Sequence, residues 1–389
     1  MELDAFQDTL QDYDLAIIGA GPVGMALALA LKDSGLRIAL LDGRARGAAR
    51  QDPRVLALSY GTRLTLERLG VWDKISATPI ASIHISQQGG LGRSLLEATE
   101  YGQDALGYVA SAGAVSAALD DALLAARIPV QNYTLVHDLK PDADGITINL
   151  NDGQPLRARL AACAEGAVQT SESNPLVEHD YQQHAVICIA TPTTPHGGRA
   201  WERFTPDGPL AVLPYGQDCA IVHTASPEHA DQLLDDHDHA YLGRLQRHFG
   251  QRLRFSAVSD RARFPLLLRY RPNPVGARTL WLGNAAQTLH PVAGQGFNLA
   301  LRDVWACAQT LLRNPGDPGQ ASTLAAYAQA RQLDRSGTIR FTDGLVRLFS
   351  NNNPLLKHAR GAGLLALDLL PGPRHFIAKR MMFGARAWP

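Results

Sequence analysis

The chain has 389 residues, of which 46% are hydrophobic and 19% charged, a profile typical of a folded protein of two domains at ~150 residues each. Its 37 Lys and Arg residues balance 37 Asp and Glu residues, and this zero net charge argues against a nucleic-acid partner. The four cysteines lie far apart with neither a CxxC pair nor ligand spacing, which excludes a disulfide framework and a zinc site. A reducing compartment fits this pattern, so we expect a cytoplasmic protein.

Two uncharged stretches, residues 15–31 and 280–301, are long enough to suggest membrane segments. Acidic residues precede the first stretch, which is the wrong charge for a secretory leader, and glycines and Pro22 interrupt it. The second stretch is rich in Asn, Gln, Thr, His and Gly. We therefore predict that neither stretch spans a membrane.

The N-terminal elements form a strand–helix–strand unit. Residues 15–18 are a short apolar run, which predicts a buried parallel strand. Residues 25–32 predict a helix, followed by Gly35 as a left-handed cap. Residues 37–41 predict a second strand, which ends at Asp42. Together these elements make a βαβ unit.

Strands and helices alternate less regularly in the rest of the chain. Hydrophobic patterns and turn residues predict strand-rich regions at 80–100 and 181–224, a helix at 116–126, a hairpin at 145–160, a buried strand at 279–282, a long helix at 297–312, and helices beyond residue 340 with a break at 351–354.

The first strand-to-helix turn carries a GxGxxG motif at residues 19–24. In such a motif Gly19 permits a tight turn, Gly21 lets the backbone approach a pyrophosphate, and Gly24 allows the helix to pack closely on the strand. Asp42 lies 18 residues past Gly24, where a carboxylate accepts hydrogen bonds from a ribose. We predict dinucleotide binding; a purely structural glycine-rich turn is the alternative.

A second glycine cluster follows the strand predicted at 279–282 and opens the helix predicted at 297–312. It can therefore also present backbone N–H groups to a negative charge. A cofactor held at two such distant places in the chain must be long, which favours FAD. Its ribityl chain would lie at Asn284 and its ring system against residues 291–296, where a helix N-terminus stabilises the negative charge of a reduced flavin.

These motifs resemble the ubiquinone-biosynthesis hydroxylases, a family of class A flavoprotein monooxygenases with the para-hydroxybenzoate hydroxylase fold. The resemblance covers the chain from about residue 13 to its C-terminus. The Gly-Asn-Ala-Ala-Gln-Thr-Leu-His-Pro form at residues 283–291 is most similar to the 2-polyprenyl-6-methoxyphenol hydroxylase branch. The matching segments are residues 19–24, 52–59, 202–211, 283–298 and 343–349.

The resemblance implies a reaction and a set of site residues. A flavin reduced by NAD(P)H uses molecular oxygen to hydroxylate a polyprenylated phenol, with the protein supplying position, electric field and exclusion of water. The candidate catalytic residues are His290 and Pro291. The candidate FAD contacts are Gly19, Gly21, Gly24, Asp42, Arg54, Asn284, Pro291, Gly294, Gln295, Gly296 and Asn298.

Four positions depart from the family pattern, one of them Ser111, which stands where an acidic residue is common. Asn284 replaces the usual Asp and keeps its hydrogen-bonding capacity without its charge. The second family fingerprint, an Asp-Gly followed by Ser and Arg, falls on residues 164–172, where Glu165 and Glu172 replace the acid and the Arg. The resemblance implies that this fingerprint takes part in FAD and NAD(P)H binding in the family. These changes therefore motivate a rival hypothesis, in which the chain is a catalytically silent FAD-binding subunit.

Two polar features have structural alternatives. His290 adjoins the predicted flavin region and could orient or deprotonate a phenol, although a hydrogen-bonding structural histidine is the interpretation we favour. Residues 235–239 resemble a metal cluster in composition but lie in a polar helical stretch, so we interpret them as a solvated face. We predict no metal site.

Residues 341–389 contain seven Lys or Arg and two acidic residues, interleaved with Leu, Phe and Met. Such a tail either contacts the anionic inner membrane, where a polyprenyl substrate resides, or packs on the core with its charges in water. Other ubiquinone-biosynthesis proteins are possible partners that deliver substrate.

We therefore expect an α/β protein in which a Rossmann-like FAD domain is interleaved with a mixed-sheet substrate domain. The FAD domain comprises residues 1–78, 105–178 and 273–340, the substrate domain residues 79–104 and 179–272, and a helical segment residues 341–389. The expected reaction is hydroxylation of a polyprenylated phenol, in the 2-polyprenyl-6-methoxyphenol step. A flavin monooxygenase of small soluble phenols is the second rival.

Overall fold

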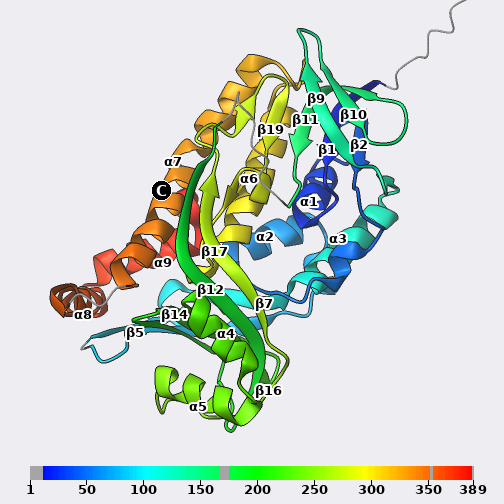
Figure 1. Ribbon diagram of the computed structural model, residues 1–389. Coiled ribbons are helices and arrows are strands. Elements are labelled where there is room, and N and C mark those ends of the chain that lie inside the picture. Colours follow the sequence, from blue (N-terminus) through cyan, green and yellow to red (C-terminus); the bar gives the residue numbers. More distant parts are fainter. Residues whose placement is uncertain (1–11, 91, 167–174, 351–353, 388–389) are drawn as a thin grey trace, which may run out of the picture.

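The computed structural model describes residues 12–90, 92–166, 175–350 and 354–387, which fold into three β-sheets with surrounding helices (Figure 1). The architecture is the α/β fold expected from the sequence: a partly parallel sheet with helices on one face, a larger mixed sheet, and helices at the C-terminal end.

The first sheet has the strand order β18-β19-β11-β1-β2-β8. Its central strands are parallel, with β1 paired to both β11 and β2, and β11 paired to β19. Two antiparallel strands, β9 and β10, extend from β11 as a separate layer. The bounds are β1 (Asp12–Ile18), β2 (Ile38–Leu41), β8 (Val130–Gln131), β9 (Val136–Pro141), β10 (Ile146–Leu150), β11 (Leu156–Cys163), β18 (Val275–Gly276) and β19 (Thr279–Trp281).

Alternating side chains of β1 pack into two different cores. Leu15 and Ile17, both fully buried, face the helices α1 (Pro22–Ala30), α3 (Ala112–Ala125) and α6 (Gln295–Arg313). Ala16 and Ile18 face the β9–β10 layer. Because β1 is buried on both faces, it is apolar at successive positions rather than alternating, which is the signal that predicts it from sequence.

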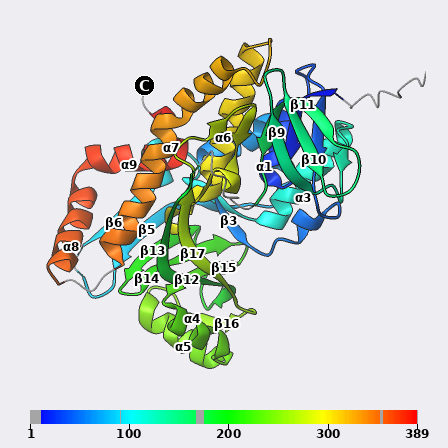
Figure 2. The ribbon, with the colours of Figure 1, turned by 45° about the horizontal axis from the view of Figure 1, so that its top comes forward.

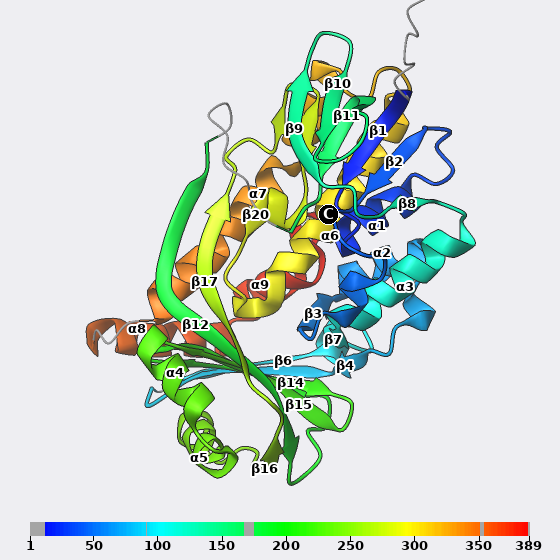
Figure 3. The ribbon, with the colours of Figure 1, turned by 45° about the vertical axis from the view of Figure 1, so that its right-hand side comes forward.

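The second sheet has nine strands in the order β20-β17-β12-β15-β14-β13-β5-β6, with β16 beside β12. Figure 3 shows β12 and β17 as long strands that run from beside the first sheet into this one. Helices α4 (Pro227–Asp235) and α5 (Asp238–Phe249) cover one face. The bounds are β5 (Ser82–Gln87), β6 (Arg93–Glu97), β12 (Val177–Pro192), β13 (Arg199–Thr205), β14 (Gly208–Tyr215), β15 (Asp218–Ala225), β16 (Phe255–Val258), β17 (Ala262–Tyr270) and β20 (Gln287–Thr288).

A small third sheet lies between the other two. It consists of β3 (Val55–Ser59), β7 (Gly107–Ser111) and β4 (Thr78–Ile80), and β3 leads into α2 (Tyr60–Arg68). Because strands of the first and second sheets come from alternating segments of the chain, we propose the interleaved domain boundaries given above.

The C-terminal part is helical: α7 (Ala321–Phe349), α8 (Pro354–Leu369) and α9 (Pro371–Phe383). Figure 2 shows α8 and α9 beside α7 at one side of the molecule. Across the described ranges, none of the helices combines the length and hydropathy that crossing a membrane requires.

A buried ion-pair network joins α7 to α6. Asp334 of α7 accepts hydrogen bonds from Arg302 of α6 and from Arg331, each at 2.8 Å, and Arg331 also pairs with Asp303 at 2.6 Å. Gln287 of β20 donates to Asp303 at 2.7 Å, which ties the second glycine cluster to both helices. Burial of charges is costly, so each member of this network depends on the others.

Most predicted elements are present, with shifted ends. The first helix begins at Pro22, inside the glycine motif, and ends at Ala30 rather than residue 32. The helix predicted at 116–126 begins at Ala112, because the Ser111 hydroxyl accepts a hydrogen bond from Ala114 N and caps it. The helix predicted beyond 340 is the end of α7, which already starts at Ala321; the break predicted at 351–354 lies mainly outside the described residues.

Candidate functional site

Four parallel strands end at one edge of the first sheet, and their following turns are joined by backbone hydrogen bonds. Gly19 N donates to Leu41 O and Ala164 N to Ile18 O, each at 2.7 Å, and Leu282 N donates to Cys163 O at 2.9 Å. The carboxyl ends of β1, β2, β11 and β19 therefore meet. In an open α/β sheet, this edge is where ligands bind.

The three glycines of the first motif have the geometry that a pyrophosphate turn requires. Gly19 has φ +104°, and a Cβ on Gly24 would lie 1.9 Å from the Gly19 carbonyl oxygen. A Cβ on Gly21 would meet no heavy atom of the described residues within 4 Å, so the space in front of this residue is open. Gly21 is also the N-cap of α1, and the described side chains leave that helix end uncapped. The free N–H groups there fit a phosphate.

The second glycine cluster packs directly onto the first. Gly283 has φ +56°, and a Cβ on it would lie 2.9 Å from Val23 Cγ2 of α1. Asn284 follows in a 3₁₀ turn, η4 (Gly283–Ala285), and its side chain is exposed. The structure thus brings together the two glycine clusters that the sequence predicts to hold opposite parts of one cofactor, with Asn284 exposed beside them.

Asp42 lies at the end of β2 and is 7% exposed. Its carboxylate accepts hydrogen bonds from Ala20 N at 2.8 Å and from Arg44 Nε and Nη2 at 3.0 and 2.9 Å. Burial opposes ionisation of Asp42, but the hydrogen bonds and charge of Arg44 outweigh it and hold its pKa below the usual range. A small hollow lined by Asp42, Arg44, Ala20 and Asp120 adjoins this pair.

Arg54 precedes β3 and pairs with Asp52 through Nε and Nη2 at 2.9 and 2.6 Å. Burial opposes ionisation of Asp52, but its hydrogen bonds with Arg54 and the charges of Arg54 and Arg44 lower its pKa. Glu165 follows β11, and a Cβ on Gly19 would lie 2.9 Å from its backbone N. Burial and the nearby charge of Asp42 raise the pKa of Glu165. Glu172 lies outside the described residues.

The turn expected to contact the flavin ring is strained. In η5 (Val292–Gly294), Ala293 has φ +60° and Gly294 has φ +61°. A Cβ on Gly294 would lie 2.8 Å from the Ala57 Cβ of β3, so only glycine fits there. A left-handed alanine costs of order 1–3 kcal/mol and persists only when its surroundings impose it. Such outliers cluster at ligand sites, and this turn leads directly into the N-terminus of α6.

The remaining residues of this turn differ in their access to a ligand. Pro291 is exposed, and a Cβ on Gly296 would meet no described heavy atom within 4 Å. Gln295 is 4% exposed, and its side-chain amide donates to Ala293 O at 3.1 Å, which supports the strained turn.

Asn298 does not have the arrangement expected of a cofactor contact. Its Oδ1 accepts from Ser59 N at 2.8 Å and from Thr62 Oγ1 at 2.7 Å, while its Nδ2 donates to Ala57 O and Gly294 O at 2.8 and 2.7 Å. Every hydrogen-bonding position of the amide is therefore used within the chain. Asn298 instead positions the Gly294 turn against β3.

His290 likewise differs from a catalytic base. It is 1% exposed, its Nδ1 accepts a hydrogen bond from Val292 N at 3.1 Å, and its ring stands edge-to-face against Tyr181. Burial lowers the pKa of His290 to about 3, so the ring is neutral at physiological pH. This arrangement fits the structural alternative, in which His290 holds the turn before the flavin region.

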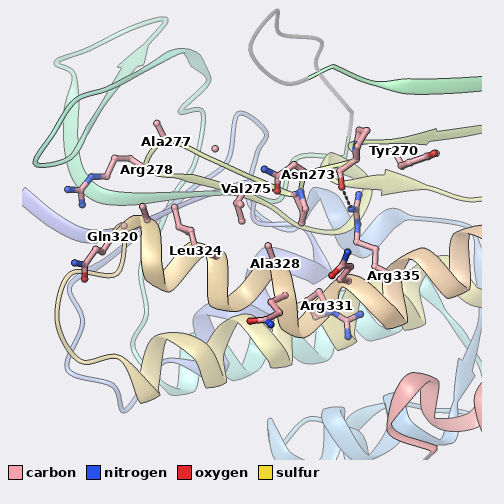
Figure 4. Close-up of a pocket in the computed structure, with 18 of the residues that line it drawn as sticks. Tyr270, Asn273, Val275, Ala277, Arg278, Gln320, Leu324, Ala328, Arg331 and Arg335 are labelled. Carbon is pink, nitrogen blue, oxygen red and sulfur yellow. Dashed lines mark hydrogen bonds between the residues drawn. The ribbon is translucent and has the colours of Figure 1, made fainter.

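Two other features lie apart from this site. A surface cavity of about 1150 Å³ lies between α7 and the 270–278 turn (Figure 4), and none of the predicted cofactor residues lines it. Residues 235–239 form the junction of α4 and α5, and no metal-binding group of His, Cys, Asp or Glu occurs among the described residues.

Arg44 and Ala293 are residues of this site that the sequence did not single out. Arg44 stands two positions after Asp42, a spacing that could have suggested the pair. The left-handed conformation of Ala293 had no local signal, because alanine does not favour it.

The fold and the paired glycine turns define a flavin-dependent oxidoreductase. The chain matches the FAD binding domain family over residues 12–342. It is 33% identical over 387 residues to ubiquinone hydroxylase UbiL of Rhodospirillum rubrum, covering 95% of this chain and 89% of that protein. It is 31% identical over 385 residues to the 3-demethoxyubiquinol 3-hydroxylase of Escherichia coli, covering 92% of this chain and 96% of that protein. The chain therefore belongs to the ubiquinone-biosynthesis hydroxylases of the FAD binding domain family.

Solved structures show the same fold. p-Nitrophenol 4-monooxygenase PnpA of Pseudomonas putida superposes with a TM-score of 0.76 at 18% identity, covering 97% of this chain and 100% of that one. The anhydrotetracycline hydroxylase OxyS of Streptomyces rimosus gives a TM-score of 0.72 at 18% identity, covering 96% of this chain and 76% of that one. The protein is an FAD-dependent monooxygenase.

Proposed function

We propose that this enzyme hydroxylates the aromatic ring of a polyprenylated phenol in ubiquinone biosynthesis, in the 2-polyprenyl-6-methoxyphenol step. The observation that carries the proposal is the joining of the two glycine clusters at one sheet edge, through the Gly283–Val23 contact, in a chain related over nearly its whole length to ubiquinone hydroxylases.

The residues of the site fit FAD. Gly21 and the N-terminus of α1 would hold the pyrophosphate, Asp42 a ribose, and Asn284 a ribityl hydroxyl. Pro291, Gly294 and the N-terminus of α6 would lie along the ring system. Bound FAD supplies the transfer of electrons from NAD(P)H and the activation of molecular oxygen. The chain itself supplies orientation and a dry environment, which prevents loss of the reactive oxygen to water.

One relative favours a different ring position. The Escherichia coli protein is a 3-demethoxyubiquinol 3-hydroxylase, so the corresponding step is the second candidate for this chain. The two candidates differ in the intermediate that accumulates in cells lacking the protein. A build-up of 2-polyprenyl-6-methoxyphenol supports our proposal, whereas a build-up of the demethoxyquinol supports the alternative.

The catalytically silent subunit and the enzyme of small soluble phenols make different predictions. A silent subunit would bind FAD without phenol-dependent NAD(P)H oxidation. An enzyme of small phenols would turn over a phenol without a prenyl chain as well as a prenylated one. Family membership and the intact flavin turns favour an enzyme over the silent subunit.

A polyprenylated substrate resides in the bilayer, so the enzyme must obtain it from there. We propose that the C-terminal helices α8 and α9 contact the membrane surface peripherally. Exposed apolar side chains there are Leu365, Leu369, Leu370 and Phe376. Of the basic residues in α9, Arg374 pairs with Glu100 at 3.3 Å and Arg380 lies 3.9 Å from Asp334, so both partly face the protein. Apolar contact would therefore contribute more than charge.

Flotation with anionic liposomes tests this contact. The Leu369→Glu, Leu370→Glu double variant should bind less than the parent while retaining FAD. Equal binding of the two proteins, or no binding by the parent at low salt, would favour delivery of substrate by another ubiquinone-biosynthesis protein.

A further inference from the structure

Glu202 lies on the face of the nine-stranded sheet that is turned away from α4 and α5. Its neighbour Trp201 is 6% exposed and stands edge-to-face against Phe249 of α5. Because side chains of a strand alternate between faces, Glu202 projects to the opposite face together with Ala200 and Phe204. We call this opposite face the inner face.

The inner face contacts two parts of the candidate site. Ala200 packs with Val109 of the third sheet, whose strand β3 touches the Gly294 turn. Phe204 packs with Val292 of that turn and stacks on Phe349 of α7, with ring centroids 3.8 Å apart. Glu202 is the residue between these two contacts on the same strand. It therefore lies opposite the turn that is expected to hold the flavin ring.

The side chains around Glu202 are apolar and accessible. Glu202 is in register with Ala211 of β14 and with Ile85 of β5, and Ala211 is in register with Val222 of β15. All of them are partly exposed, whereas Val212, on the other face, is fully buried. The inner face around Glu202 is therefore apolar and incompletely covered by the described residues, which suits contact with an apolar ligand.

The Oε1 atom of Glu202 is buried and has no hydrogen-bond partner in the described part of the chain. Burial alone raises the pKa of Glu202 to about 7, so the group can both accept and release a proton near neutral pH. A buried, unsatisfied carboxyl oxygen in a native fold requires an explanation, and a ligand that donates a hydrogen bond provides one.

We propose that Glu202 accepts the hydroxyl hydrogen of the phenolic substrate and holds its ring against residues 291–296. This inference rests on the proposed function. The proton moves from the phenol oxygen to a Glu202 carboxylate oxygen, and the electron pair of the O–H bond stays on the phenol and makes the ring more nucleophilic. One atom of O₂ is transferred to a ring carbon as the O–O bond breaks, and the other leaves as water with the two electrons from NAD(P)H and two protons. The hydroxylated carbon then loses its hydrogen as a proton. The first proton then returns from Glu202 to the phenol oxygen.

The test compares a short-chain 2-prenyl-6-methoxyphenol with its methyl ether, which has no hydroxyl hydrogen to donate. Binding of each to the FAD-loaded enzyme is followed by the change in flavin absorbance. The parent should prefer the phenol by about tenfold or more, the scale of a hydrogen bond to a charged group. Glu202→Leu should lose this preference. Glu97→Gln, at an exposed carboxyl of β6 in the same sheet, is the control and should behave like the parent.

Glu202→Gln separates binding from chemistry. Its amide oxygen can still accept the hydrogen bond but cannot take the proton, so it should bind the phenol while its hydroxylation rate falls by about 100-fold or more. FAD content of each variant reports on folding. A parent that binds neither compound would contradict the proposed function and with it this role. If the parent enzyme prefers the phenol but Glu202→Gln hydroxylates it as fast as the parent, the role of Glu202 is wrong while the proposed function stands. The same holds if Glu202→Leu prefers the phenol as strongly as the parent does.

Discussion

The guanidinium group of Arg44 pairs with both carboxylate oxygens of Asp42, at 3.0 and 2.9 Å, two positions along the chain from it. Asp42 also accepts a hydrogen bond from Ala20 N of the glycine motif, so it joins the end of β2 to the turn after β1. The side chain of Arg44 is 55% exposed and that of Asp42 is 8% exposed, so the guanidinium group is the more accessible member of the pair.

Asp42→Asn should weaken FAD binding by roughly 1–3 kcal/mol, because the amide retains one acceptor oxygen but loses the charge that strengthens its hydrogen bonds. Fluorescence titration of the cofactor-free protein with FAD measures the change. Asp14→Asn is a suitable control, since Asp14 pairs with Arg37 near the start of β2. An Asp42 variant that binds FAD like the control would remove Asp42 from the site.

Gly21→Val should abolish tight FAD binding without loss of the fold. The added side chain meets no described heavy atom at its Cβ, so it occupies the space that the pyrophosphate requires rather than clashing with the protein. Gly24→Val should instead destabilise the protein, because its Cβ would lie 1.9 Å from the Gly19 carbonyl oxygen. Thermal unfolding and FAD titration of both variants distinguish the two effects. A Gly21 variant with normal FAD affinity would contradict the placement of the pyrophosphate.

The glycine turns could be predicted because their signal is local. A tight turn, a close approach and a strand-to-helix junction each require particular residues at fixed spacing, and Gly19, Gly24 and Asp42 meet those requirements within one βαβ unit. The role of Asn298 could not be predicted in the same way. Its amide is satisfied by Ser59, Thr62 and Ala57, which lie far away in sequence, so only the folded chain shows that nothing remains for a ligand.

The same limit applies to the buried polar groups. His290 adjoins the flavin turn in sequence, but its burial depends on packing against Tyr181 of β12. Glu202 belongs to a segment that resembles the family, yet its position on the inner face follows from strand register with β5 and β14. Strand order and register in a mixed sheet are long-range properties, and the sequence pattern carries little information about them.

Asn284→Ala should weaken FAD retention by roughly 1–2 kcal/mol, the scale for losing one polar hydrogen-bonding group. Asn284→Asp should be tolerated, because Asp is the usual residue of the family at this position. The rate of FAD release on dilution measures both effects. If the alanine variant releases FAD no faster than the parent, Asn284 has no ribityl contact.

Asp334→Asn should destabilise the fold by about 3–5 kcal/mol, because it leaves Arg302 and Arg331 buried with one less charge partner. Burial opposes ionisation of Asp334, but these arginines outweigh it and lower its pKa to about 2, below the ordinary value of 3.8. The stabilisation is therefore complete above about pH 4 and is lost as the pH falls toward 2.

Urea unfolding of the parent and Asp334→Asn at about pH 6 and about pH 3 should show a smaller difference at the lower pH. Asp121→Asn, which removes a half-exposed partner of Arg50, should change stability by less than about 0.5 kcal/mol at either pH. An Asp334 variant as stable as this control would show that the network does not hold α6 and α7 together.

The most direct test of the account is turnover with isotopically labelled molecular oxygen. The FAD-loaded enzyme, supplied with NAD(P)H and a prenylated 6-methoxyphenol, should form a ring-hydroxylated product that carries one labelled oxygen atom, and Gly21→Val should form none. NAD(P)H oxidation that is independent of the phenol, or a product without label, would contradict the assignment of this chain as a phenol hydroxylase.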